Sequence, residues 1–397
     1  MHESTTAANT AVLVSLDFGA PDYAESLEEL RLLAESAGVH TVALVEGRRQ
    51  RPDASLFAGS GKVDEIAAIV EQHEVPLVIF NHDLSPAQMR NLTARLQARV
   101  IDRTMLILDI FALRAQSHEG KVQVELAQLK YLSTRLVGMN TDMGQQKYAV
   151  GARGPGETQL ELDRRKLDKR VQLLRERLEK LRRHRQVLRK SRNRSEVMSV
   201  SIVGYTNAGK STLFNRLTHA NVYVANQLFA TLDTTARRVF IAGPRQQEGD
   251  AADTEHSSAP HARGQEVVLS DTVGFIRHLP HGLVAAFRST LEETAMADLL
   301  LHVVDANSPE RHDQIAEVNK VLHEIGAENI PQILIFNKID LQDLPAAVKR
   351  DEYGKIISIH LSAKTGAGID ELRAAIAEFR DTQALSVQTQ AWHPLNN

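Results

Sequence analysis

The sequence contains no cysteine, which excludes disulfide bridges and thiolate metal sites from this chain of 397 residues. It also lacks any run of about 20 apolar residues, the length that a membrane-spanning helix needs. Its first ten residues show no basic start followed by an apolar stretch, so we expect no secretory signal. These absences favour a cytoplasmic protein, with partial association with the membrane left open. We separately expect the protein to be a monomer.

Positive charge is concentrated in one segment, although the net charge of the whole chain is only −3. From Arg164 to Arg194 the sequence holds fifteen Lys and Arg against three acidic residues, a local net charge of +12. The rest of the chain therefore carries a net −15. The alternative is that the segment is an ordinary solvent-exposed helical face. Such a face usually carries charges of both signs, so the excess of positive charge favours contact with a polyanion.

Residues 10–116 alternate short apolar runs with amphipathic ones, which predicts a small α/β domain with a mostly parallel sheet. Ser85 and Pro86 form a good helix start, with serine as the cap and proline in the first turn. The predicted strands are 11–16, 41–45, 77–80 and 99–102, and the predicted helices are 24–37, 62–73 and 86–98.

The spacing of Gly59, Gly61 and Lys62 resembles part of a phosphate-binding loop. It reads G-x-G-K and lacks the full eight-residue pattern. We therefore favour a packing role for these residues over a second nucleotide site. This argues against an alternative function, that of an ATP-dependent RNA remodeller working through the N-terminal domain.

Residues 117–195 are predicted to form two long helices, 117–138 and 157–195. Leucine and valine recur in both at spacings that produce a narrow apolar seam, which is typical of an antiparallel helical hairpin. The connection over 140–156 holds four glycines and a proline. We expect this turn to form the tip of the hairpin.

Residues 197–380 alternate strand and helix patterns again and form the third predicted domain. Segment 243–265 is rich in small and charged residues without an apolar pattern, which predicts a mobile hairpin insert. Residues 381–397 are predicted to be a weakly structured tail. The predicted strands are 197–203, 238–242, 266–270, 299–305, 332–337 and 356–361, followed by a helix over 368–380.

The segment GYTNAGKS, Gly204–Ser211, fits the phosphate-loop pattern G-x4-G-K-S between an apolar strand and a helical pattern. Backbone N–H groups of such a loop close around phosphates, and Lys210 adds a point charge. Ser211 offers its hydroxyl to Mg2+. In this context a chance glycine-rich turn is the weaker alternative.

The segment DTVG, Asp271–Gly274, directly follows the predicted strand 266–270. We expect Asp271 to hold Mg2+ through water, and the Gly274 N–H to face the γ-phosphate. The second direct Mg2+ ligand should be a threonine before the second strand. Thr231 is preferred over Thr234 and Thr235.

The segment NKID, Asn337–Asp340, follows a strand and predicts selection of guanine. The Asp340 carboxylate can accept hydrogen bonds from N1–H and the 2-amino group of guanine, whereas adenine offers neither donor. Lys338 can lay its stem over the base. In SAK, Ser362–Lys364, the Ala363 N–H would reach the guanine oxygen.

Four such motifs in chain order, each at a strand end, predict a guanine nucleotide site at the carboxyl edge of a parallel sheet. We expect Lys210, Thr231 and Gly274 to take part in catalysis. The full set expected to bind GTP is Gly204, Tyr205, Thr206, Asn207, Ala208, Gly209, Lys210, Ser211, Thr212, Asp271, Thr272, Val273, Gly274, Asn337, Lys338, Asp340, Ser362, Ala363 and Lys364.

Several longer segments resemble the HflX GTPases, which are ribosome-associated. These are FAGSGKVDEI at 57–66, IDRTMLILDIFALRA at 101–115, RGPGETQLELDRR at 153–165 and DTVGFIRHLP at 271–280, together with the motifs above. The resemblance implies an α/β fold in which a P-loop GTPase domain follows a small α/β domain and a long basic helical hairpin. The family's LDPT reads Leu232–Thr235 here, without proline.

The resemblance further implies GTP-dependent binding to the large ribosomal subunit and the splitting or rescue of stalled or idle ribosomes under stress. An RNA-binding GTP switch in ribosome assembly, with little turnover, is the alternative. The residues expected to contact ribosomal RNA are Arg153, Gly154, Arg182, Arg183 and Arg185.

The position directly after D-x-x-G, where many small GTPases carry a water-orienting glutamine, is Phe275 here. A phenyl ring cannot hydrogen-bond water, so we expect slow intrinsic hydrolysis. Either another residue or the ribosome must complete the site, and we expect the ribosome to accelerate the reaction. Asn207 matches an asparagine that holds K+ in some related GTPases. A purely loop-shaping role for Asn207 is the alternative.

Overall fold

A computed structural model describes residues 9–137, 155–192, 197–219, 228–229, 231–232, 235–241, 265–277, 291 and 293–391. The chain divides into two compact units, each of which is described by itself. The first comprises Met1–Arg185 together with the short segments Gln227–Leu232 and Leu279–Phe287. The second contains Gln186–Asn226, Asp233–His278 and Arg288–Asn397.

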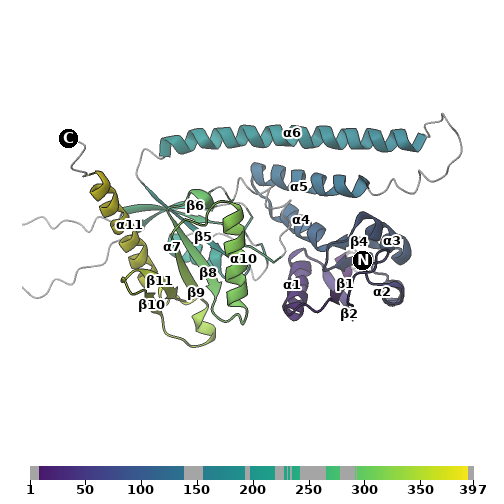
Figure 1. Ribbon diagram of the computed structural model, residues 1–397, viewed down its shortest axis with the longest axis horizontal. Coiled ribbons are helices and arrows are strands. Elements are labelled where there is room, and N and C mark those ends of the chain that lie inside the picture. Colours follow the sequence, from purple (N-terminus) through teal and green to yellow (C-terminus); the bar gives the residue numbers. More distant parts are fainter. Residues whose placement is uncertain are drawn as a thin grey trace, which may run out of the picture. The chain divides into compact units, whose positions relative to one another are not determined.

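The first unit is built on a parallel four-stranded sheet, as the alternating pattern predicts (Figure 1). Its strand order is β2-β1-β3-β4. The central strands are almost completely buried because helices cover both of their faces, which explains their continuous apolar sequences. The strands are β1 (Thr10–Asp17), β2 (His40–Arg48), β3 (Leu77–Phe80) and β4 (Arg99–Asp102).

Three of the helices around this sheet were predicted and one was not. Ser85 begins α3 with a capping box, in which its hydroxyl accepts the Gln88 N–H and the Gln88 side chain accepts the Ser85 N–H. Helix α4 was missed, although Asp102 at the end of β4 is an N-cap residue that could have marked its start. The helices are α1 (Tyr23–Ser36), α2 (Ser60–Gln72), α3 (Pro86–Leu96) and α4 (Arg103–Arg114).

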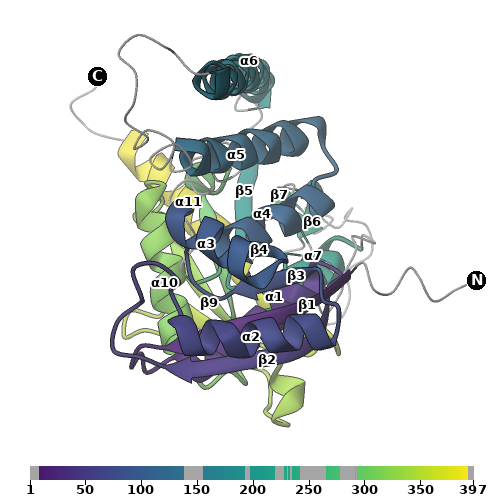
Figure 2. The ribbon, with the colours of Figure 1, turned by 90° about the vertical axis from the view of Figure 1, so that its right-hand side faces the viewer.

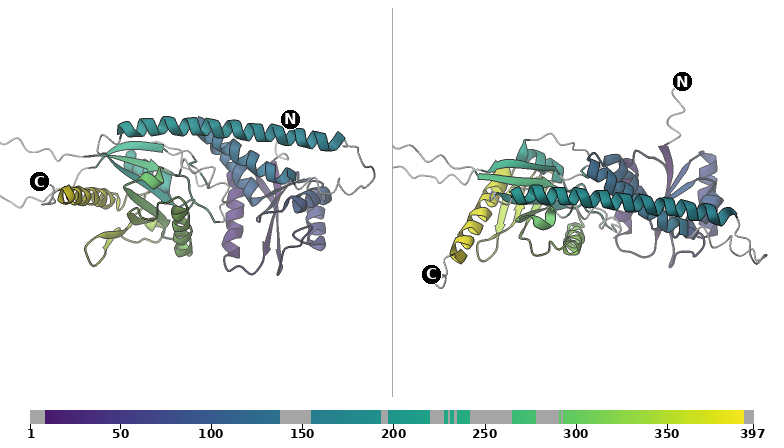
Figure 3. Two further views of the ribbon diagram at one scale, coloured as in Figure 1. Left: turned by 45° about the horizontal axis from the view of Figure 1, so that its top comes forward. Right: turned by 90° about the horizontal axis from the view of Figure 1, so that it is seen from above.

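The predicted pair of long helices is present as α5 (His118–Val137) and α6 (Pro155–Arg192), which run side by side (Figures 1 and 2). The 38 residues of α6 form one uninterrupted helix (Figure 3). Leu174 is fully buried against Val122 and Leu126 of α5, so the predicted seam is real but short. Gly156, expected in the turn, is helical. Pro155 of the expected turn is helical as well, and residues 140–154 lie outside the described residues.

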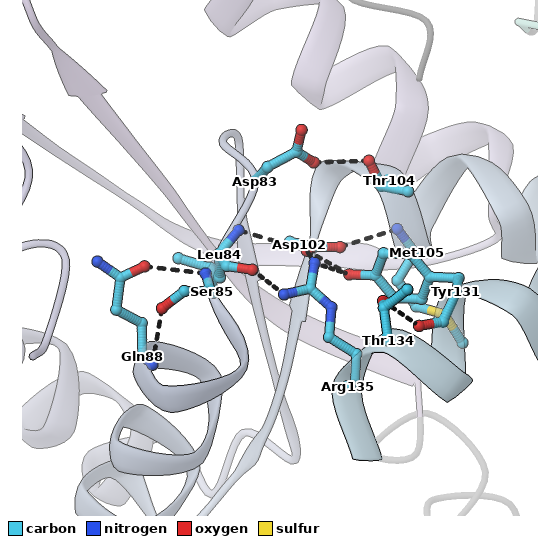
Figure 4. Close-up of polar contacts among 10 residues, drawn as sticks. All are labelled: Asp83, Leu84, Ser85, Gln88, Asp102, Thr104, Met105, Tyr131, Thr134 and Arg135. Carbon is cyan, nitrogen blue, oxygen red and sulfur yellow. Dashed lines mark hydrogen bonds and ion pairs between the residues drawn. The ribbon is translucent and has the colours of Figure 1, made fainter. Parts of the chain in front are cut away.

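A buried ion pair connects α5 to the sheet of the first unit (Figure 4). Asp102, at the end of β4, is completely buried and caps α4 by accepting the Met105 N–H at 2.9 Å. Its other oxygen accepts the Tyr131 hydroxyl and lies 2.8 Å from the Arg135 guanidinium. Burial raises the pKa of Asp102, whereas its hydrogen bonds and Arg135 act in the opposite direction. The cluster therefore holds the base of the hairpin against β4.

We predict that Arg135→Met lowers the free energy of unfolding of this unit by about 3–5 kcal/mol, because it leaves Asp102 buried without its cation. The folded-state pKa of Asp102 is raised above its unfolded value, and it would rise further in this variant. The loss should therefore shrink as pH falls, since the folded state then takes up the proton more readily. Urea unfolding followed by circular dichroism at neutral and acidic pH measures both effects.

Two controls accompany this experiment. The double variant Asp102→Asn/Arg135→Met removes both charges and should recover most of the stability. Arg95→Met breaks the exposed pair with Asp64 and should cost about 1 kcal/mol or less. Equal losses for Arg95→Met and Arg135→Met would contradict the role assigned to the buried pair.

The second unit contains a seven-stranded sheet of order β10-β11-β9-β8-β5-β7-β6, parallel except at its two edges. Its core packs α7 and α11 against buried aliphatic side chains of the central strands. The strands are β5 (Met198–Gly204), β6 (Thr235–Ile241), β7 (Gln265–Asp271), β8 (Leu299–Asp305), β9 (Gln332–Asn337), β10 (Ala347–Arg350) and β11 (Ile356–His360). The main helices are α7 (Lys210–Thr218), α10 (Arg311–Glu324) and α11 (Ile369–Ala391).

Three features of this unit differ from the predictions. Strand β10 was missed because every residue of this edge strand is exposed, so no apolar alternation marks it. Helix α10 was not predicted, although Val318, Val321 and Leu322 occupy its buried face. Helix α11 continues to Ala391, beyond the predicted start of an unstructured tail. The predicted insert lies outside the described residues, except that Gln265 begins β7.

Candidate functional site

The phosphate-loop sequence connects the end of β5 to the start of α7, as predicted. Gly209 adopts φ +93°, and a Cβ there would lie 2.2 Å from Asn337 Nδ2, so only glycine fits. The Lys210 ammonium is buried and donates to the Tyr205 carbonyl at 2.8 Å. Burial lowers the pKa of Lys210 to about 8, with the Asp271 carboxylate opposing the shift. A bound phosphate would favour the charged form in the same way.

Two of the predicted magnesium ligands meet at the end of β7. The Ser211 hydroxyl donates to Asp271 Oδ2 at 2.8 Å. A hydroxyl and a carboxylate are the hard oxygen donors that Mg2+ prefers, so this pair fits the ion. Thr212 follows on the first turn of α7 and is half-buried.

The segment after β7 is bonded to the phosphate loop. The Thr206 N–H donates to the Phe275 carbonyl at 2.8 Å, and the Phe275 N–H donates to the Gly204 carbonyl at 3.1 Å. Thr272 is anchored separately, because its hydroxyl donates to the Ile202 carbonyl at 2.7 Å. Val273 and Gly274 are buried between these anchors.

The side chains predicted to read the base lie at the ends of β9 and β11. Asn337 Nδ2 donates to the Ala208 carbonyl at 2.9 Å, which joins this region to the phosphate loop. Asp340 is positioned by the Ser362 hydroxyl, which donates to its Oδ1 at 2.6 Å. The Ala363 N–H donates to Asn337 Oδ1 at 2.9 Å, so a guanine contact at this N–H would have to share that bond. Lys364 is exposed.

Two ion pairs of this unit were not predicted from the sequence. Asp305, at the end of β8, forms an ion pair of 2.7 Å with Lys338. The rule that ligand-facing groups follow parallel strands could have found it. The Arg277 guanidinium lies 2.6 Å from Glu310, which precedes α10. No local motif marks that pair.

Thr231 is buried in a segment that the contacts group with the first unit. The neighbouring Phe229 ring packs edge-to-face on Phe111 of α4, with centroids 4.7 Å apart. The Leu228 N–H donates to the Ser36 hydroxyl at 2.9 Å. The assignment of Thr231 as a magnesium ligand therefore stays a prediction, and Thr234 lies outside the described residues.

Helix α6 exposes many cations along its described length. Three of them form ion pairs with acidic neighbours, since Arg165 pairs with Glu161, Arg170 with Glu125 of α5, and Arg183 with Glu179. Of the predicted RNA contacts, Arg183 is exposed. Arg153, Gly154 and the side chains of Arg182 and Arg185 lie outside what the structure describes. The exposed cations are Arg164, Arg165, Lys166, Lys169, Arg170, Arg175, Arg177, Lys180 and Arg183.

Among the residues that the structure describes, no helix has the length and apolar character to cross a membrane.

Three family models match the chain in sequence order. The model "GTP-binding GTPase N-terminal" matches residues 24–112, and "GTP-binding GTPase Middle Region" matches 114–192. The model "50S ribosome-binding GTPase" matches 199–338, the region that holds the phosphate loop and NKID. These matches confirm the predicted P-loop GTPase fold.

Individual proteins are similar over most of the chain. GTPase HflX of Escherichia coli (strain K12) is 50% identical over 379 residues, which cover 95% of this chain and 84% of that protein. GTPase HflX of Caldanaerobacter subterraneus is 43% identical over 389 residues, with coverages of 97% and 84%. The crystal structure of a complex of SsGBP and GDP is 25% identical with a TM-score of 0.51, covering 94% of this chain and 99% of that chain. The chain therefore belongs to the HflX family of GTPases, enzymes that hydrolyse GTP to GDP and phosphate.

Proposed function

We propose that the second unit binds GTP with Mg2+ at its strand ends, and that the GTP-bound protein binds the large ribosomal subunit and splits stalled or idle ribosomes. The observation that carries the nucleotide site is the contact between motifs distant in sequence. Asn337 bonds to the phosphate-loop carbonyl of Ala208, and Ser211 bonds to Asp271. Together these contacts bring a phosphate cradle, a metal pair and a base-reading loop into one unit.

In this proposal each motif has one role. The loop amides and Lys210 hold the phosphates, while Ser211 and Asp271 hold Mg2+, which would neutralise the charge that develops on the phosphate oxygens. Gly274 presents its N–H to the γ-phosphate, and Asp340 reads the guanine edge. Asn207 is exposed in a left-handed conformation, with φ 58°, and is proposed as a K+ ligand.

Contact with ribosomal RNA is proposed for α6. Its exposed cations outnumber the acids beside them, and ribosomal RNA offers a dense array of phosphates. The match to a model described as a 50S ribosome-binding GTPase favours the large subunit as the source of that RNA. A GTP switch in ribosome assembly would use the same surface with little turnover. Turnover in the presence of large subunits separates these two functions.

Sedimentation with separated ribosomal subunits tests the proposed partner. We expect the protein to sediment with large subunits in a non-hydrolysable GTP analogue and to a much smaller extent in GDP. Light scattering by intact ribosomes should fall when the protein and GTP are added. Binding to both subunits alike in either nucleotide would rule out the proposed switch.

We predict that hydrolysis by the isolated protein is slow and that large subunits accelerate it. The Phe275 ring cannot orient water, and its backbone is already bonded to the phosphate loop. Single-turnover rates with and without subunits measure the effect, and exchange of K+ for Na+ in the same assay tests Asn207. Equal rates with and without ribosomes would exclude completion of the site by the ribosome.

A further inference from the structure

Thr206, the third residue of the phosphate loop, carries a buried hydroxyl with no hydrogen-bond partner. The residue is 7% exposed. Among the residues that the structure describes, Thr206 Oγ1 is the only buried side-chain hydroxyl without a partner. An unsatisfied buried hydroxyl is unfavourable for folding, so its presence calls for a physical reason.

The surroundings of this hydroxyl suggest that reason. A Cβ placed on Gly274 would lie 2.8 Å from Thr206 Cγ2 and 2.9 Å from Lys210 Nζ. The Thr206 methyl carbon and the Lys210 ammonium therefore both lie against Gly274, the backbone that is assigned to the γ-phosphate, and Oγ1 is bonded to the same Cβ as that methyl carbon. Other hydroxyls nearby are already used, since that of Thr272 donates to Ile202 and that of Tyr205 accepts the Arg277 N–H.

The chain also needs a group to orient the attacking water. Phe275 stands where a glutamine would do this, and it is only 1% exposed. Its N–H and carbonyl are both bonded to the phosphate loop. A polar group for the water therefore comes either from another residue beside Gly274 or from the ribosome.

We propose that the Thr206 hydroxyl orients the attacking water during GTP hydrolysis, an inference that rests on the phosphate-loop assignment above. Oγ1 accepts a hydrogen bond from the water, and its O–H donates a hydrogen bond to a γ-phosphate oxygen. The water oxygen forms a bond to the γ-phosphorus while the bond from phosphorus to the β–γ bridging oxygen breaks. The water's proton passes to a γ-phosphate oxygen, which gives GDP and dihydrogen phosphate. Thr206 keeps its proton throughout.

Thr206→Val tests this role, because valine keeps the branched shape and replaces the hydroxyl with a methyl group. We expect the single-turnover rate at saturating GTP to fall about 10- to 100-fold, as for loss of one positioned transition-state hydrogen bond. The affinities for GTP and GDP should stay within about threefold of the parent's. The affinity for GDP with aluminium fluoride, which mimics the transition state, should fall by about the same factor as the hydrolysis rate. Thr206→Ser keeps the hydroxyl and should hydrolyse GTP nearly as fast as the parent.

A control substitution is Thr218→Val at the end of α7, where the lost hydroxyl donates to the Phe214 carbonyl. It should lower the melting temperature and leave the hydrolysis rate unchanged, whereas Thr206→Val should not lower the melting temperature. Parental hydrolysis by Thr206→Val would overturn the proposal. So would a joint loss of GTP and GDP binding, which would mean that Thr206 only shapes the loop. A parent protein that binds no GTP would instead refute the phosphate-loop assignment itself.

Discussion

Replacement of Asp340 by asparagine is expected to lower GTP affinity by about 100- to 1,000-fold and to raise the affinity for XTP. The carboxylate would accept two donors of guanine, and asparagine offers one acceptor and one donor instead. The asparagine N–H would face the 2-amino group of guanine, and two donors cannot bond to each other. The 2-amino group would be left without a partner, which lowers the binding affinity. Xanthine carries an oxygen at that position and would accept the new N–H.

The structure suggests that this substitution leaves the loop intact. Asp340 Oδ1 accepts the Ser362 hydroxyl at 2.6 Å, and an asparagine oxygen can accept the same bond. Titration of the variant with fluorescent GTP, XTP and ATP analogues measures the three affinities. Asp343→Asn is the matched control, because it removes an exposed carboxylate from the same loop. Parental GTP affinity in Asp340→Asn would refute the assignment of this residue to the base.

Reversing three cations of α6, in the variant Lys169→Glu, Arg177→Glu and Lys180→Glu, is expected to reduce affinity for the large subunit by about 100-fold or more at low salt. All three side chains are exposed, and their spacing along the helix brings them to one face. That face is separate from the seam in which Leu174 packs on α5, so the hairpin should keep its fold. The dependence of binding on salt should also become shallower, because fewer counterions are released.

A matched variant separates this effect from a change in net charge. Lys320→Glu, Lys349→Glu and Lys355→Glu make the same charge change at exposed positions of the second unit. This control should bind subunits as the parent does, and both variants should retain parental GTP affinity. The measurement is subunit binding at several salt concentrations beside a nucleotide titration. If the α6 variant binds as tightly as the parent at every salt concentration, α6 is a solvated face and the RNA contact lies elsewhere.

The sequence alone determined the class of the protein and the identity of its nucleotide motifs. Each motif is a short run whose chemistry is local, such as Gly209, whose φ of +93° favours glycine, or Lys210, which follows it directly. Strands β3, β4, β8 and β9 were placed exactly, because buried parallel strands have apolar sequences with clear ends. The charge excess of α6 was equally visible, since it depends on composition.

Only the tertiary structure decided which groups meet. Asp102 and Arg135 lie 33 residues apart in sequence, and their ion pair exists because α5 packs against the end of β4. Asp305 reaches Lys338 because β8 and β9 are neighbours in the sheet. The unsatisfied hydroxyl of Thr206 could not be foreseen, because threonine usually finds a partner in its own backbone or in water. A motif indicates chemistry that depends on residues adjacent in sequence. Whether a side chain is buried and finds a hydrogen-bond partner depends instead on long-range packing, which a single sequence does not reveal.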